Sequence, residues 1–411
     1  MISLFSTRNY RLLFSASAIS NLGDGVSALA FPWLATLITR DPMLIALVAV
    51  ATRLPWLLFS IPAGVWTDRV DRRRLMVQAD LVRFLLTAGV ISVILSAPDF
   101  PIENGTPYIL ALCALAFLLG SAEVVRDNAA QTVLPAVVDK SQLEQANGQI
   151  WSIEQIMGSF VGPPLAGFLI AYAVPAPFML DAVTFAGAAL LVWCMRLSPT
   201  NTPDTPRRSW VAEARDGVHW LWTHREILQL AILLGFMNAM TIMALTILPL
   251  FGQEILNLNA AQYGLLLTVE AAGGVAGGLI GPALATRLGT RRSVVLVMPV
   301  TMIGWSIIAL SSNVWLVGPA LFIGMFAGML WNVVTVSYRQ RRIPDELLGR
   351  VNSLYRFFGW GMLPIGALLG GALVSLAEPE LGREMALRLP YWVAAGGMAL
   401  IWLYSSLKLR L

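Results

Sequence analysis

The sequence predicts an all-α membrane protein with twelve transmembrane helices in two pseudo-symmetric six-helix halves. Three observations support this prediction: the chain is unusually apolar, its apolar runs have the length of membrane spans, and its basic residues collect on alternate loops. Of 411 residues, 57% are hydrophobic and 13% are charged, with a mean hydropathy of +0.70. A soluble domain carries about 25% charged residues, so the composition indicates a polytopic membrane protein.

A helix that crosses the hydrocarbon core of about 30 Å needs about 20 apolar residues, because it rises 1.5 Å per residue. Apolar runs broken by charge, proline, glycine or asparagine predict twelve such helices. In chain order they cover residues 12–38, 44–67, 75–97, 108–133, 145–172, 176–196, 227–252, 261–285, 293–311, 314–337, 349–376 and 386–407.

The basic residues give the expected orientation. Of the 28 lysines and arginines, 21 lie at the termini or in the loops that follow even-numbered spans, and three lie on the opposite side. Short loops rich in lysine and arginine are retained in the cytoplasm. We therefore expect both termini to be cytoplasmic and the protein to lie in a bacterial cytoplasmic (inner) membrane. The polar start, Met1 to Arg11, leads into a run too long for a signal-peptide core, so no cleaved signal peptide is expected.

The longest polar segment divides the chain into an N-terminal six-helix half, residues 1–196, a linker, residues 197–225, and a C-terminal six-helix half, residues 226–411. The linker begins with a stretch rich in proline, threonine and asparagine. Its second part places apolar residues on one face of a helix, which predicts a short amphipathic helix in the cytoplasmic interface. These apolar residues are Trp210, Val211, Ala214, Val218, Leu221 and Trp222.

The loop between the second and third spans is short and highly charged. It runs Gly64-Val65-Trp66-Thr67-Asp68-Arg69-Val70-Asp71-Arg72-Arg73-Arg74. A stretch this polar cannot lie in hydrocarbon, so it predicts a tight turn at the cytoplasmic surface. Residues 285–292 repeat it weakly in the second half, with Thr286 in the place of Asp68.

A second repeat relates the two halves. Asn147-Gly148-Gln149 opens a helix that ends in the glycine- and proline-rich run 162–167, and Asn352-Ser353-Leu354 opens one that ends in the glycine-rich run 366–371. Each follows a charged loop with an apolar–proline pair. Two homologous halves indicate a transporter built on internal repeats.

The pattern Gly-x-x-x-Asp-Arg-x-x-Arg-Arg and the two halves around a central cytoplasmic loop resemble the major facilitator superfamily (MFS). Within it, the chain resembles the macrolide-efflux and enterobactin-export group of drug and siderophore exporters. The motifs that carry this likeness are Ser20-Asn21-Leu22-Gly23-Asp24, Phe31-Pro32-Trp33-Leu34, Arg53-Leu54-Pro55-Trp56, Asp127-Asn128-Ala129-Ala130-Gln131 and Gly349-Arg350-Val351-Asn352. The resemblance implies a monomeric secondary transporter that works by alternating access, with helices 1, 4, 7 and 10 around its cavity.

Charged residues inside the spans are the candidate functional residues, because a charge at mid-helix costs about 2.5–3.5 kcal/mol even on the gentler scales. Helix 4 is the richest: Glu123, Asp127 and Gln131 share one face, and Arg126 could pair with Glu123. With Asp24 in helix 1 and Glu270 in helix 8, these residues form the proposed proton-coupling and substrate-cavity set. The alternatives are a structural Glu123–Arg126 pair and a pairing of Asp24 with Arg53.

A second set is expected to act at gates or between the halves. Four of its members, Arg53, Glu154, Asp181 and Arg356, lie inside spans. Arg83 and Arg356 are expected to extend towards the cytoplasmic surface. The resemblance also implies that Asp68 with Arg69, Arg72 and Arg73, in the loop that begins at Gly64, makes charge pairs that steady one conformation; alternatively these charges only fix topology.

Two further patterns bear on the transport reaction. Gly158, Gly162, Pro163, Pro164 and Gly167 resemble the helix 5 motif of MFS antiporters, although glycines of this kind also serve helix packing alone. Methionines along helix 7 and aromatic residues such as Trp331 suit varied apolar ligands, although such residues are more often core or lipid-facing.

The sequence lacks the signatures of other functions. No Walker loop, HExxH motif or zinc-ligand spacing occurs, and the two cysteines, Cys113 and Cys194, lie in apolar runs. We therefore expect no enzyme activity, cofactor, metal or nucleic-acid partner. The expected function is export of an amphipathic small molecule, such as a drug, antibiotic or siderophore-like compound, coupled to protons. The alternatives are proton-independent transport, uptake, lysolipid flipping, an intramembrane aspartyl protease and a ligand sensor.

Overall fold

The computed structural model describes residues 4–67, 70–98, 100, 102–139, 142–196 and 218–409, and the regular structure in these residues is helical. The chain forms two compact units. Unit 1 comprises Met1–Arg40, Leu47–Asp204 and Leu258–Thr268, and unit 2 comprises Asp41–Ala46, Thr205–Asn257 and Val269–Leu411. Each unit therefore contains most of one predicted half, together with a short segment from the other.

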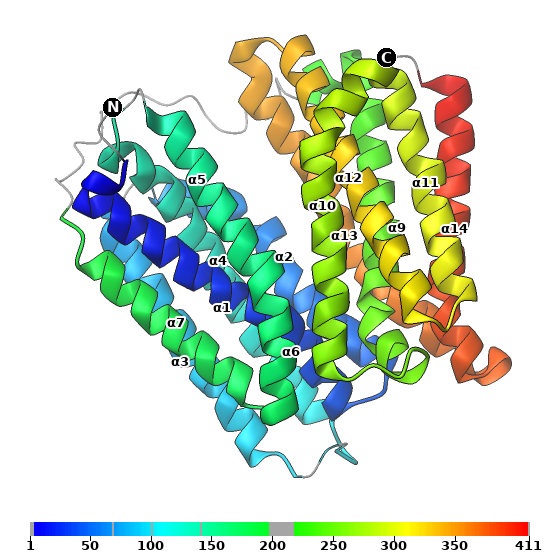
Figure 1. Cartoon of the computed structure of the whole chain (residues 1–411), viewed down its shortest axis with the longest axis horizontal. Coiled ribbons are helices and arrows are strands. Elements are labelled where there is room, and N and C mark those ends of the chain that lie inside the picture. The colour runs from blue at the N-terminus through cyan, green and yellow to red at the C-terminus, as the bar shows by residue number, and fades with distance from the viewer. Residues whose placement is uncertain are drawn as a thin grey trace. The chain divides into compact units, whose positions relative to one another are not determined.

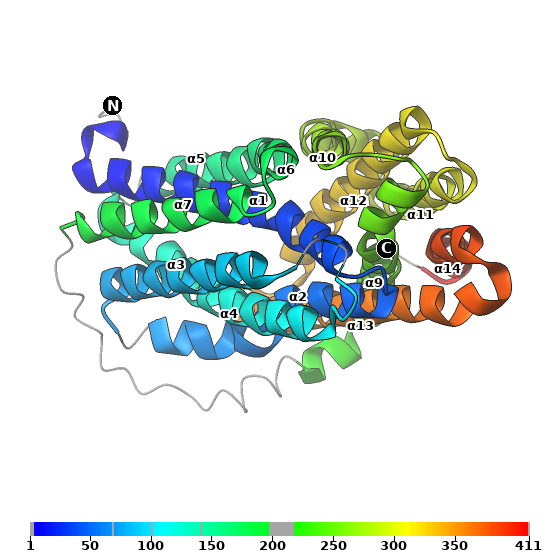
Figure 2. The same ribbon diagram turned by 90° about the horizontal axis from the view of Figure 1, so that it is seen from below.

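The long helices of unit 1 are drawn from blue to green in Figure 1. A short 3-10 helix, η1 (Leu4–Ser6), precedes α1 (Arg8–Ile38), α2 (Pro42–Thr67), α3 (Arg72–Ser96), α4 (Thr106–Val137), α5 (Leu143–Gln155), the π-helical η3 (Ile156–Val161), α6 (Gly162–Tyr172) and α7 (Ala176–Trp193). Helix α3 packs on α4 and α7, and α1 packs on α6 and α7 (Figure 2). This arrangement brings the mid-spans of α1, α3 and α4 together.

Unit 2 contains the remaining long helices, drawn from green to red in Figure 1. They are α9 (Arg225–Glu254), α10 (Ala260–Leu288), α11 (Thr290–Leu310), α12 (Val314–Arg342), α13 (Asp345–Leu381) and α14 (Arg383–Lys408). Helix α13 packs along α9, and α11 packs on α12 and α14. The predicted amphipathic linker helix lies mostly outside the described residues, of which the stretch 218–223 is helical.

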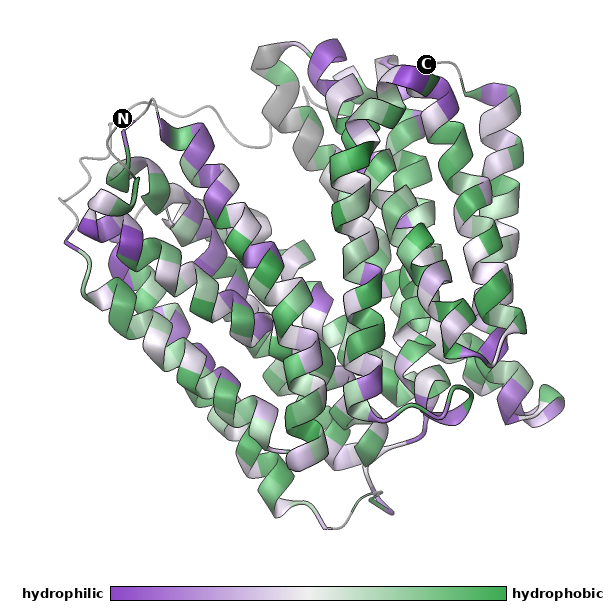
Figure 3. Cartoon of the chain, viewed as in Figure 1, coloured by the Kyte–Doolittle hydropathy of each residue, from purple (hydrophilic) through white to green (hydrophobic). Residues whose placement is uncertain are grey.

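The predicted all-α membrane fold is confirmed. Within the described residues, eleven helical segments are long and apolar enough to cross a membrane. Figure 3 colours the helices by residue hydropathy: green predominates along them, and many of the purple, hydrophilic stretches lie near helix ends. The prediction was twelve. Helix α1 has 31 residues, so its length suffices, but serines, Asn21 and Asp24 make it more polar than the other eleven.

The predicted fifth span, 145–172, is not one regular α-helix. It changes to π-helix at Ile156–Val161 and resumes as α6 at Gly162. Pro163 and Pro164 explain the change, because proline lacks an N–H group and its ring clashes with the carbonyl four residues earlier. A wider π turn accommodates this interruption without ending the helix.

Glycines let the first helix of each half lie directly against a partner helix. A Cβ added at Gly162 of α6 would lie 2.5 Å from the backbone of Gly25 in α1, and one at Gly366 of α13 would lie 2.4 Å from the carbonyl oxygen of Ala239 in α9. The two glycine runs recognised as a sequence repeat therefore serve the same packing role in the two units.

We expect Gly162→Ala to destabilise unit 1, because the added methyl group would meet backbone atoms that cannot move aside. The matched control is Gly148→Ala in α5, where an added Cβ meets nothing within 4 Å. Alanine favours helix by about 1 kcal/mol over glycine, so the control should keep or gain thermal stability. Thermal unfolding of both purified variants measures the difference, and equal unfolding temperatures would contradict the packing assignment.

Candidate functional site

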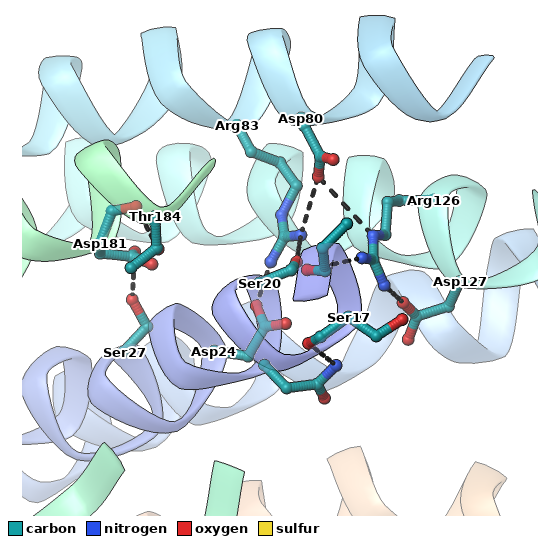
Figure 4. A network of polar contacts seen from close by, with 12 residues as sticks. Ser17, Ser20, Asp24, Ser27, Asp80, Arg83, Arg126, Asp127, Asp181 and Thr184 are labelled. Carbon is teal, nitrogen blue, oxygen red and sulfur yellow. Dashed lines mark hydrogen bonds and ion pairs between the residues drawn. The ribbon is translucent and has the colours of Figure 1, made fainter. Parts of the chain in front are cut away.

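Two arginines are buried in the middle of unit 1. The side chain of Arg83 in α3 is 2% exposed, and that of Arg126 in α4 is 1% exposed. Arginine stays protonated in proteins, so neither side chain escapes its charge by releasing a proton. Each guanidinium group therefore requires carboxylates and other acceptors within the unit. Its neighbours define the candidate site, which Figure 4 shows.

Arg83 joins α3 to α1. It forms an ion pair with Asp24, donates a hydrogen bond of 3.1 Å to the hydroxyl oxygen of Ser20, and lies 3.5 Å from a carboxylate oxygen of Asp80. Its guanidinium carbon lies 3.8 Å from the centre of the Phe185 ring in α7. A cation over an aromatic face is stabilised by the ring electrons, so Arg83 connects α3 with two other helices, α1 and α7.

Arg126 joins α4 to the same two helices. Its Nε atom lies 3.7 Å from the Asp80 carboxylate, and a terminal nitrogen lies 3.4 Å from Asp127. Another terminal nitrogen donates a 3.3 Å hydrogen bond to the carbonyl oxygen of Ala16 in α1. Asp80 thus lies between the two arginines, and one of its carboxylate oxygens interacts with both (Figure 4).

Asp80 was missing from the residues that the sequence analysis selected. It lies inside the predicted third span, three residues before Arg83, so the rule that marks intramembrane charges as functional would have found it. Its side chain is 0% exposed, whereas those of Asp24 and Asp127 are 24% and 32% exposed. We call Arg83, Arg126 and the three aspartates the network. Asp80 is its solvent-inaccessible member, and Asp24 and Asp127 form its solvent-accessible edge.

The network contains more acid than base. Two guanidinium groups interact with three aspartates, and the charges of Glu123 in α4 and Glu154 in α5 also act on this group. Carboxylates that lie close to one another in a low-dielectric interior favour sharing a proton, because the full set of negative charges repels itself. The arrangement is suited to binding and releasing protons at its accessible edge.

Three expectations, two of them pairings, differ from the contacts found. Arg126 interacts with Asp80 and Asp127, whereas the sequence suggested Glu123 as its partner. Asp24 pairs with Arg83 instead of Arg53, because the long arginine side chain of α3 reaches α1 at this level. The expectation that Arg83 extends towards the surface is wrong, because its side chain is buried.

Asp181 lies at the contact of α7 with α1. It is buried and accepts a 2.6 Å hydrogen bond from the Ser27 hydroxyl. Gly23 makes room for it, because an added Cβ there would lie 2.3 Å from the Asp181 carboxylate. Asp181 was expected at a gate; within unit 1 it lies in a helix packing contact close to the network.

The other selected residues lie apart from these contacts. Gln131 and Arg53 are exposed, and Glu154 is half-buried next to the π turn. Arg72 donates a 3.0 Å hydrogen bond to the carbonyl oxygen of Thr132, and Arg73 lies over the Trp193 ring at 5.3 Å, so both tie α3 to neighbouring helices of unit 1.

Five selected positions remain: Gly64, Asp68, Arg69, Arg356 and Glu270. Gly64 belongs to the last turn of α2, while Asp68, Arg69 and the side chain of Arg356 lie outside the described residues. Glu270 lies in α10, where it lines a cavity of unit 2. The predicted charge pairs of the loop at 64–74 with the second half stay a prediction.

We expect Asp80→Asn to destabilise the protein more than Asp127→Asn does. Asp80 is the shared and fully buried acceptor of two arginines, and removing one partner of a buried ion pair costs about 3–5 kcal/mol. Asp127 is one-third exposed, so water can replace its contact with Arg126. Thermal unfolding of the two purified variants tests this order; a smaller effect for Asp80→Asn would remove Asp80 from the centre of the network.

Comparison with known proteins places this architecture in a family. A family model described as transmembrane secretion effector, of MFS type, matches residues 2–400. The multidrug efflux pump Tap of Mycobacterium tuberculosis is 27% identical over 399 residues, which cover 92% of this chain and 90% of the relative. The enterobactin exporter EntS of Citrobacter koseri is 27% identical over 392 residues, covering 92% and 88%.

Solved structures agree on the fold. A bacterial homologue of the human lysosomal transporter Spinster has a TM-score of 0.74 at 14% identity, covering 100% of this chain and 99% of that one. The nucleoside transporter NupG has a TM-score of 0.68 at 13% identity, covering 98% and 100%. These relatives are transporters, not enzymes, as the sequence analysis expected. The chain is a multi-pass membrane protein that belongs to the transmembrane secretion effector family of the MFS.

Proposed function

We propose that this protein exports amphipathic small molecules in exchange for protons, by alternating access. Two findings support export: the family description names secretion, and two relatives are named as an efflux pump and an exporter. Proton coupling is inferred from the residues of unit 1. The observation that carries it is the excess of carboxylates over arginines in a buried network that has an accessible edge.

The proposed proton sites are Asp24 and Asp127. Each pairs with a buried arginine, and each keeps part of its side chain accessible. Protonation of either acid removes its negative charge and weakens its ion pair with Arg83 or Arg126. Asp80 holds both guanidinium groups in the unit meanwhile, because it is shared and inaccessible.

Protonation would change which conformation is favoured because the network connects helices. Arg83 links α3 to α1 and α7, and Arg126 links α4 to α1 and α3. Protonation of Asp24 weakens the pair that joins α3 to α1. Asp127 lies beside Arg126 on α4, so its protonation acts indirectly, by changing the charge next to the guanidinium group that contacts Asp80 and Ala16. A transporter responds in this way when two conformations differ by only a few kcal/mol, so that a local change of charge shifts their populations.

The remaining expectations complete the proposal. The protein acts as a monomer with two six-helix halves, both termini face the cytoplasm, and the charges of the loop at 64–74 steady one conformation between the halves. The positive-inside count supports this orientation. Within unit 1, the contacts of Arg72 and Arg73 with α4 and α7 would hold this loop in place.

We expect Asp24→Asn and Asp127→Asn to uncouple transport from the proton gradient. The experiment reconstitutes the protein in proteoliposomes, imposes a pH gradient, and follows a lipophilic fluorescent cation or a macrolide. Wild type should move the compound against its gradient, while each variant should move it only down its gradient. Asparagine keeps the shape of the side chain but removes the titrating group.

The matched control is Glu144→Gln, which removes an exposed carboxylate of unit 1 outside the network. It should leave gradient-driven transport unchanged. Flux that responds neither to the gradient nor to Asp24 and Asp127 would refute proton antiport and favour a facilitator or a lipid carrier. Proton-driven flux that survives both substitutions would keep antiport but place its coupling acid elsewhere.

A further inference from the structure

Unit 2 contains a cavity of about 260 Å³ between α9, α10, α11, α12 and α14. Its wall is largely apolar, with methionines and the rings of Trp305 and Trp331. Its polar members are Asn238, Thr241, Glu270, Thr301 and Asn332. Among the described residues that line this cavity, Glu270 alone carries a formal charge.

The position of Glu270 is fixed by close helix packing. Two of the glycines that follow it along α10 lie against α12: an added Cβ would lie 2.0 Å from the carbonyl oxygen of Phe322 at Gly273 and 2.7 Å from that of Phe326 at Gly277. The backbones of α10 and α12 therefore touch at this level. Glu270, about one turn earlier, is held at the cavity wall.

The described residues of unit 2 place no counter-charge beside Glu270. Among the described residues, no arginine, lysine or histidine forms an ion pair with its carboxylate, and no residue that lines the cavity is basic. This contrasts with unit 1, where every aspartate of the network contacts an arginine. An acid within a membrane span normally faces a partner or a site of function. For the Glu270 carboxylate, the suitable partner is a positively charged group supplied by a ligand.

Trp305 supplies a second unused polar group. Its side chain lines the cavity and is only 6% exposed, and its indole N–H has no hydrogen-bond partner among the described residues. A buried donor without an acceptor is costly, and a water molecule bound in the cavity would supply that acceptor. The faces of Trp305 and Trp331 also offer the electron-rich surface that attracts organic cations.

We propose that this cavity binds an organic monocation with a small apolar body, such as an aryl- or alkylammonium ion. Glu270 pairs with the charged nitrogen, and the indole rings and methionines contact the apolar body. Anions are excluded because the lining carries one negative charge and no positive one. The volume is slightly below the range of about 300–1,000 Å³ typical of sites for drug-sized ligands, which favours a small cation.

The site lies wholly within unit 2 and goes beyond the proposed export activity. Its occupancy does not require proton coupling by the unit 1 network. It is therefore tested by equilibrium binding, without transport, so that failure of one proposal does not imply failure of the other. The full-length purified protein in detergent is incubated with radiolabelled trimethyl(phenyl)ammonium, and neutral tert-butylbenzene serves as the competitor of the same shape.

We expect saturable binding of the cation to wild type and at least a roughly tenfold weaker affinity in Glu270→Gln. A tenfold loss corresponds to about 1.4 kcal/mol. Two opposite charges in close contact attract each other, and water in the cavity replaces only part of that attraction. Competition by tert-butylbenzene should be weak in wild type and relatively stronger in the variant, because the charge no longer distinguishes the two compounds.

A second variant blocks the cavity without changing its charge. Gly324 of α12 borders the cavity, and an added Cβ there meets nothing within 4 Å, so Gly324→Leu would fill open space. The matched control is Gly396→Leu in α14, where an added Cβ also meets nothing within 4 Å and which does not line the cavity. Leucine favours helix over glycine, so both variants should fold.

Gly324→Leu should abolish saturable binding, and Gly396→Leu should leave the affinity unchanged. Thermal unfolding of each variant confirms that the protein is folded. Absence of saturable binding to wild type would overturn the proposal. An affinity that Glu270→Gln leaves unchanged would also overturn it, because the cavity would then bind by apolar contact alone.

Discussion

The structure of unit 1 depends on the permanent charge of two buried arginines. A buried lysine or histidine can lose its proton, but a guanidinium group cannot, so Arg83 and Arg126 require acceptors wherever they lie. Asp80 lies within ion-pair distance of both, and Asp24, Asp127, Ser20 and the carbonyl oxygen of Ala16 supply further acceptors. The arginines thereby fix the mid-spans of α1, α3 and α4 relative to one another.

Close approach of helix backbones at glycines allows the polar side chains of α1 to reach those of neighbouring helices. Gly25 of α1 lies against Gly158 and Gly162, where the chain changes from π-helix to α6, and Gly23 leaves space for Asp181 of α7. Helices that approach this closely leave little room for side chains between them. Small residues on α1 therefore bring its polar groups within reach of α3, α4 and α7, at the expense of the apolar character that marks the other spans.

The two units use the same helix packing for different electrostatics. In both, a glycine-rich helix lies against the first helix of its half, α6 on α1 and α13 on α9. Unit 1 gathers two buried arginines and three aspartates in one network, whereas the cavity of unit 2 is lined, among the described residues, by one acid with tryptophans and methionines. The two halves therefore share a backbone arrangement but differ in their side chains. In our proposals, unit 1 binds and releases protons, and unit 2 binds an organic cation in a largely apolar cavity.

The sequence by itself determined the membrane class, the helix boundaries to within a few residues, the internal repeat and the family, because apolar run length and loop charge are local properties of the chain. It also identified Asp24, Arg126 and Asp127 as candidates, since any charge inside a span is costly. Only the tertiary structure decided which charges pair. Asp80 bridges two arginines, Arg83 is buried instead of reaching the surface, and Glu270 meets a cavity without a cation. Such contacts depend on the level and rotation at which helices far apart in sequence pack together, and no local pattern encodes that geometry.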